Sequence, residues 1–156
     1  MGKNLLVAID DSENAIRAVE FVANFFTPDN RVTLFSVIQD TAALCEMNSP
    51  ELTPYFTAQQ SSFCLLEDKK KELVNEALLK AKEILMEAGF EEENIAIKQE
   101  IKKRGVARDI INEAKSGYNA IVMGRRGLSG IKDFILGTIS QKVFNTAKDI
   151  SVLVVN

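Results

Sequence analysis

Apolar residues follow two alternating patterns along the chain. Five short segments are apolar, either almost continuously or at every second residue, as in strands of a covered sheet: residues 3–9, 31–38, 95–101, 120–123 and 152–155. Between them, apolar residues recur at helical spacing in residues 15–26, 73–88, 106–114 and 139–147. Gly89 is predicted at the C′ position, directly after the end of the second helix. The alternation predicts an α/β fold, with one doubly wound, five-stranded parallel sheet and helices on both faces.

One long connection departs from this alternation. Residues 40–64 hold two of the three prolines and show little periodicity. We expect an irregular or partly helical excursion on the surface; a lid or a partner-contact surface is the alternative interpretation. No internal repeat or change of composition marks a second domain, so residues 1–156 are predicted to form one domain.

The composition of the chain excludes several classes of catalytic and metal-binding sites. The chain has 156 residues and a net charge of −3, so no global basic field attracts nucleic acid, and an anion site must be built locally. The absence of histidine excludes His-based nucleophile systems and His-ligated zinc. Cys45 and Cys64 are too few for a Cys₄ zinc site or an iron–sulfur cluster, and we expect two free thiols.

Hydrophobicity also bears on location. No apolar run reaches the ~18 residues that span a bilayer. Met1–Asp10 lacks the long apolar stretch of a secretory signal. We therefore expect a cytoplasmic protein without a membrane partner.

A glycine-rich segment follows the fourth predicted strand. Four of the eight glycines lie between positions 124 and 137, and Thr138 opens the last predicted helix. Glycine lets a ligand approach backbone N–H groups closely, and a helix N-terminus adds a positive dipole end, so the segment is predicted to bind an anion. Arg125, Arg126 and Lys132 supply positive charge. The alternative interpretation is that the glycines only shape the connection between strand and helix.

The position of this segment constrains the strand order. The chain has neither a Walker A loop nor a GxGxxG dinucleotide fingerprint. In open α/β sheets, ligands bind at the carboxyl ends of strands where the strand order reverses. The segment shares a crevice with the Asp10-Asp11-Ser12 turn only if the first and fourth strands are neighbours. The order 3-2-1-4-5 meets this condition.

The spacing Gly124-x₂-Gly127-x₉-Gly137-Thr138 matches the motif G-x₂-G-x₉-G-[S/T], in which the chain resembles the ATP-binding members of the universal stress protein family. The resemblance runs from VAIDDSE near the start to SVLVV at the end, and includes IVMGRRGLSG and LGTIS. It implies a fold similar to that of the adenine nucleotide α hydrolases, with the strand order 3-2-1-4-5.

The resemblance also implies a set of nucleotide-binding residues. Arg125 and Arg126 depart from the family, where a small polar residue and a histidine are common; they would tighten triphosphate binding or face solvent. Asp10 is, from the residues alone, equally an acid that caps a helix. The implied nucleoside contacts are Ala8, Ile9, Asp10 and Val37, and the implied phosphate contacts are Gly124, Gly127, Gly137 and Thr138, flanked by Met123 and Ile139.

The predicted function is that of a nucleotide-dependent switch or sensor whose ligand is ATP with Mg²⁺. Hydrolysis needs an oriented water and usually a fixed metal ion. Asp10, Asp11 and Glu13 could position Mg²⁺ on the phosphates, but no dedicated acidic cluster has clear metal-binding spacing, so we expect slow hydrolysis at most. The alternatives are an ATP-using transferase or ligase, and a nucleotide-independent interaction module that acts through residues 40–64. The sequence names no signalling partner.

The last predicted strand lies at an edge of the sheet. Residues 152–155 are apolar and lack the lysines or prolines that protect exposed edges, so we expect the strand to be paired. Antiparallel pairing across a twofold axis would cover it, and the family resemblance implies such a homodimer through residues 151–155.

Overall fold

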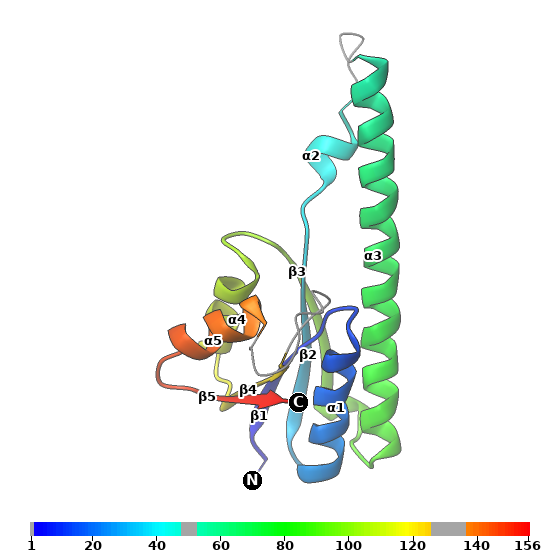
Figure 1. The fold of residues 1–156 in the computed structure, drawn as a ribbon. Coiled ribbons are helices and arrows are strands. Elements are labelled where there is room, and N and C mark those ends of the chain that lie inside the picture. Colours follow the sequence, from blue (N-terminus) through cyan, green and yellow to red (C-terminus); the bar gives the residue numbers. More distant parts are fainter. Residues whose placement is uncertain (1, 48–52, 126–136) are drawn as a thin grey trace.

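The computed structural model describes residues 2–47, 53–125 and 137–156. Its five strands form one parallel sheet in the order β3-β2-β1-β4-β5, which confirms the predicted topology (Figure 1). The chain runs in one direction from β1 to β3 and in the other from β4 to β5, so the strand order reverses between β1 and β4. The strands are β1 (Asn4–Ala8), β2 (Arg31–Ile38), β3 (Ile95–Ile101), β4 (Ala120–Gly124) and β5 (Ser151–Val155).

Helices cover both faces of the sheet, as the alternating pattern predicted. Successive side chains of a strand point to opposite faces, so Leu5 and Val7 pack against one helical layer and Leu6 against the other. The first layer holds α1 (Glu13–Phe25) and α3 (Pro54–Glu87), and the second holds α4 (Val106–Ala114) and α5 (Thr138–Thr146). A short helix, α2 (Ala42–Cys45), and a 3₁₀ turn, η1 (Glu92–Asn94), complete the described elements.

Helix α3 begins much earlier than periodicity predicted. The Thr53 hydroxyl caps it by accepting from the Phe56 N–H at 3.2 Å, and Pro54 occupies its first turn. Its buried residues all lie in the second half, from Val74 to Leu85, whereas the first half projects beyond the sheet (Figure 1). An unburied half needs no apolar stripe, so periodicity found only the packed half. Neither α3 nor any other helix of the described residues is long and apolar enough to cross a membrane.

The expectation of two free thiols is wrong: Cys45 and Cys64 form a disulfide. Helix α3 runs back past α2 (Figure 1), which brings the two Cα atoms to 5.9 Å, within the range that a disulfide bridges. The Gln60 side chain holds the same contact by donating to the Leu44 carbonyl at 2.5 Å and the Met47 carbonyl at 3.0 Å. The 19-residue separation of the cysteines gave no sign of this return of the chain.

Candidate functional site

Two cavities lie at opposite ends of the sheet. The larger, of about 360 Å³, lies at the carboxyl ends of β1, β2 and β4. The smaller, of about 220 Å³, lies where β1 and β2 begin, next to Asn4 and Arg31. In open parallel sheets ligands bind at the carboxyl ends of strands, where the strand order reverses. The larger cavity occupies that place, and its volume lies within the range of small-molecule sites.

Most of the predicted site residues meet at this larger cavity. Arg126 and Gly127 fall outside the described residues, and Arg125 does not line the cavity. The cavity is lined by the predicted residues Ala8, Ile9, Asp10, Val37, Met123, Gly124, Gly137, Thr138 and Ile139.

Arg125 ties the end of β4 to its neighbours. Its backbone N–H donates to the Val155 carbonyl at 2.7 Å, and its carbonyl accepts from the Gly137 N–H at 2.8 Å. Its guanidinium donates to the Asn156 side-chain oxygen at 3.0 Å. The structure therefore turns this arginine toward the C-terminal residue, not toward the cavity.

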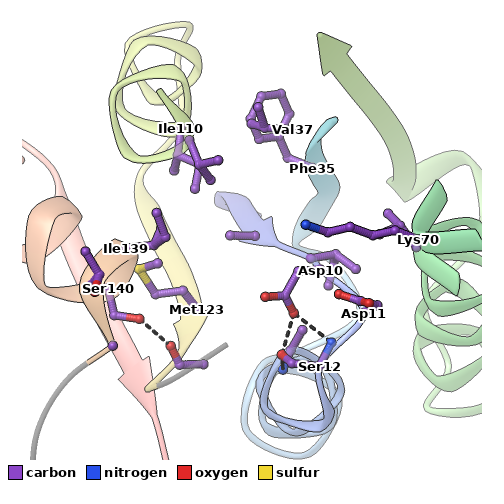
Figure 2. A pocket seen from close by; sticks show the side chains of 18 residues that line it. Asp10, Asp11, Ser12, Phe35, Val37, Lys70, Ile110, Met123, Ile139 and Ser140 are labelled. Carbon is purple, nitrogen blue, oxygen red and sulfur yellow. Dashed lines mark hydrogen bonds between the residues drawn. The ribbon is translucent and has the colours of Figure 1, made fainter. Parts of the chain in front are cut away.

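Asp10 organises the start of α1. One of its carboxylate oxygens accepts from the Ser12 N–H at 2.9 Å and from the Ser12 hydroxyl (Figure 2). The Ser12 oxygen in turn accepts from the Ala15 N–H at 3.3 Å as the N-cap of α1. Asp10 thus takes part in ordering a helix start, which was one of its two predicted roles, and it also lines the cavity.

The two described glycines of the motif have packing and hydrogen-bonding roles of their own. A side chain on Gly124 would place its Cβ 2.6 Å from the Asn14 carbonyl oxygen, so only glycine fits there. The Gly124 carbonyl also accepts from the Ser140 hydroxyl at 2.7 Å. The N–H of Gly137 is engaged by Arg125, and its φ of −59° is open to any residue. These contacts join the end of β4 to the start of α5.

Backbone donors at the cavity come from the start of α5. An α-helix leaves its first N–H groups without partners inside the helix. The N-cap of α5 is Gly137, which has no side chain to cap them, and Thr138 and Ile139 stand at the cavity wall. This end of the helix carries the positive end of the helix dipole, so it favours a negatively charged group.

The cavity is also lined by apolar residues that sequence reasoning missed. Phe35 shares a face of β2 with the predicted Val37, so strand alternation could have found it. Val106 and Ile110 of α4 and Val74 of α3 add apolar surface, but they lie far from the motif in sequence. This apolar wall suits a flat ring, whereas the α5 end suits an anion.

Within the described residues, three charged side chains line the cavity: Asp10, Asp11 and Lys70. The Oδ1 atom of Asp11 is buried and has no hydrogen-bond partner within the described part of the chain. Lys70 comes from α3, and Figure 2 shows it reaching over Asp11 toward Asp10. Among residues 2–47, 53–125 and 137–156, no group of three His, Cys, Asp or Glu side chains is placed to hold a metal ion.

Comparison with known proteins connects this geometry to one family. The model of the universal stress protein family matches residues 1–156. The chain is similar to the universal stress protein YxiE of Bacillus subtilis (strain 168), with 31% identity over 144 residues and 92% of each chain covered.

Solved structures of other proteins share the fold. Universal stress protein UspA from Lactobacillus plantarum superposes with a TM-score of 0.68 at 19% identity, covering 99% of this chain and 97% of that one. The universal stress protein from Archaeoglobus fulgidus in complex with dAMP gives a TM-score of 0.56 at 18% identity, covering 100% of this chain and 98% of that one.

Proposed function

The chain belongs to the universal stress protein family, and from this premise we propose that it binds ATP and acts as a nucleotide-dependent switch or sensor in a stress response. The observation that carries the proposal is the cavity at the strand-order reversal, where an apolar wall and the start of α5 line the same space. That combination fits a ligand with a flat ring at one end and negative charge at the other.

Each part of ATP has a matching part of the cavity in this proposal. The adenine ring packs against Phe35, Val37 and Ile110, which are apolar. Asp10 contacts the nucleoside, since its carboxylate stands beside this wall and accepts hydrogen bonds. The phosphates bind near Gly124 and the start of α5, together with Gly127, and Mg²⁺ is carried on the phosphates.

The A. fulgidus relative in complex with dAMP supports an adenine nucleotide as the ligand class. The choice of ATP follows from the motif Gly124-x₂-Gly127-x₉-Gly137-Thr138, whose spacing this chain keeps without a gap. Bound ATP would favour the conformation of the protein to which it binds more tightly. Such a shift between two conformations is how a nucleotide-binding protein serves as a switch.

We propose binding without rapid turnover. The described cavity offers two acids and a lysine but no group of three metal-binding side chains, and no histidine exists to act as a base. Phosphoryl transfer depends on positioned metal ions and an oriented nucleophile. We expect hydrolysis well below the roughly one per second at which kinases begin; faster release of phosphate by pure protein would contradict this part of the proposal.

The proposal is tested by calorimetric titration of the protein with ATP, with and without Mg²⁺. Wild type should bind, and Gly137→Val should weaken binding at least about tenfold, because the added side chain stands where the ligand approaches the start of α5. The φ and ψ of Gly137 suit valine, and the unfolding midpoint of the variant, measured alongside, shows that a loss of binding does not come from a loss of folding. Ala147→Val, at the other end of the same helix, is the matched control and should leave the affinity unchanged.

Absence of binding by wild type, together with no adenine nucleotide released when the purified protein is denatured, would overturn the proposed function.

A further inference from the structure

Three consecutive lysines on α3 have three different environments. The Lys69 Nζ lies 3.6 Å from the Oε2 of Glu72, three residues further along the helix, and both side chains are exposed. Lys71 donates to the Thr41 hydroxyl at 3.1 Å, in the segment that leads into α2. Lys70 lines the cavity, and within the described residues no hydrogen bond or ion pair engages its ammonium group. Lys70 is therefore the lysine of this run that is available to a ligand.

The charge of the cavity gives this lysine a specific task. Asp10 and Asp11 both line the cavity, and two carboxylates repel a phosphate chain. The sequence left Arg125 and Arg126 either to bind the phosphates or to face solvent; Arg125 donates to Asn156 instead, and Arg126 lies outside the described residues. Among the described residues that line the cavity, Lys70 is the only cation.

Helix α3 holds Lys70 at the cavity by burying the next turn. Val74, one turn further along, also lines the cavity and is buried against the core, and Leu78 continues the same buried face. The side chain of Lys70 is long enough to swing within the cavity, and Figure 2 shows it on the side opposite Ser140 and Ile139 of α5. A ligand between them would be faced by α5 on one side and by the ammonium group on the other.

We propose that Lys70 is a specificity-determining residue of the nucleotide site, which favours ligands with more phosphate groups by binding phosphate oxygens. This inference rests on the proposed function and extends it to a residue outside the glycine motif. An ammonium donates charge-assisted hydrogen bonds to phosphate oxygens. Its contribution therefore grows with the negative charge of the ligand and vanishes for a ligand without phosphate.

The test compares wild type, Lys70→Ala and Lys70→Arg in titrations with ATP, AMP and adenosine. Lys70→Ala should weaken ATP binding about tenfold, AMP binding less, and adenosine binding less than about twofold. Lys70→Arg keeps the charge and should recover most of the ATP affinity. The ATP affinity of wild type should fall more steeply with increasing salt than that of Lys70→Ala. Salt screens the attraction between the Lys70 ammonium and the phosphates, which only wild type has.

Lys69→Ala is the matched control, since it removes the same charge from the neighbouring exposed position. It should change ATP affinity less than about twofold. An equal loss for ATP and adenosine in Lys70→Ala, or an equal loss in Lys69→Ala and Lys70→Ala, would overturn the role of Lys70. Unchanged ATP affinity in Lys70→Ala would overturn it too while leaving the proposed function standing, whereas a wild type that binds none of the three ligands would overturn both.

Discussion

Gly124 shows that one motif residue can meet two demands. The motif associates it with close approach of a phosphate, and the structure gives it a second reason, since the Asn14 backbone leaves no room for a Cβ. Asp10 is similar, because one carboxylate group both orders Ser12 at the start of α1 and lines the cavity. Substitution of either residue would therefore affect folding as well as binding, which is why Gly137 and Lys70 are the better test positions.

A buried charge away from the cavity allows a test of stability at the scale of single residues. Lys98 of β3 donates to the Glu113 carboxylate of α4 at 2.7 Å, and the Glu113 side chain is only 7% exposed. The Tyr118 hydroxyl donates to the other Glu113 oxygen at 3.1 Å. The hydrogen bond from Glu113 raises the pKa of Lys98 above its ordinary value of 10.5, and Glu100 adds to this effect.

Lys98→Met should lower the free energy of unfolding by about 1–2 kcal/mol at neutral pH, because Glu113 loses its cation while Lys98 itself is partly exposed. A raised pKa means that the folded state holds the proton more tightly. The contribution is thus complete below pH 10.5 and is lost as the pH rises through the raised pKa of the folded protein. Urea denaturation of both proteins from neutral to alkaline pH measures this.

Tyr118, whose pKa is raised chiefly by burial, is present in both proteins. If the difference in the free energy of unfolding between wild type and Lys98→Met grew at alkaline pH, the stabilising role assigned to the Lys98–Glu113 pair would be contradicted.

At the scale of elements, α3 is divided into two halves by its packing. Val74, Leu78, Ala81 and Leu85 bury the second half against the core, and Gly89, with a φ of 101°, ends the helix as predicted. The first half is exposed, with Tyr55 at 76% and Leu65 at 70%, and its described connections run to α2. These are the disulfide and the bonds from Gln60; the bond from Lys71 to Thr41 follows just past the middle of the helix.

Reduction of Cys45–Cys64 with dithiothreitol should loosen α2 and the first half of α3 but not the second half. The bridge closes a loop with a sequence separation of 19, for which the chain-entropy model predicts about 3 kcal/mol of stabilisation. Amide hydrogen exchange should therefore become faster in residues 42–47 and 54–66 after reduction, while residues 74–85 keep their protection.

The double variant Cys45→Ser, Cys64→Ser serves as the control, because its exchange should match that of the reduced protein and be insensitive to dithiothreitol. Identical exchange of wild type before and after reduction would show that the bridge does not hold these elements.

At the scale of the whole molecule, β5 forms one edge of the sheet and pairs only with β4 in the described structure. Its residues Val152, Leu153 and Val154 are only partly buried, so apolar side chains accompany an unpaired backbone edge. We propose a homodimer in which the edges at residues 151–155 pair across a twofold axis.

Sedimentation velocity should give a dimer at micromolar concentration, because pairing satisfies the exposed backbone groups of β5 and covers its apolar side chains. A stable monomer over that range would contradict the proposed interface.

The sequence by itself determined the five strands, the packed parts of the main helices, and their order. The bounds of β2 and β3 agree with the predicted runs at 31–38 and 95–101. Strand β2 lies within the sheet and has to be apolar where it is buried, whereas β3 is a mostly exposed edge strand that the alternation of its isoleucines revealed. The order of the strands followed from one condition, that the turn at Asp10 and the segment at Gly124 share a crevice, and the structure confirms the order. Both inferences use local patterns and a general rule about parallel sheets.

Tertiary structure alone decided which distant residues meet. Lys70 and Ile110 reach the cavity from helices outside the motif, Cys45 meets Cys64 because α3 runs back past α2, and Arg125 turns to Asn156. None of these contacts leaves a periodic signal, since each depends on where packing places an entire helix or chain end. Periodicity reports whether a segment is buried, but the partner of a polar or charged side chain is set by the three-dimensional arrangement of the other elements.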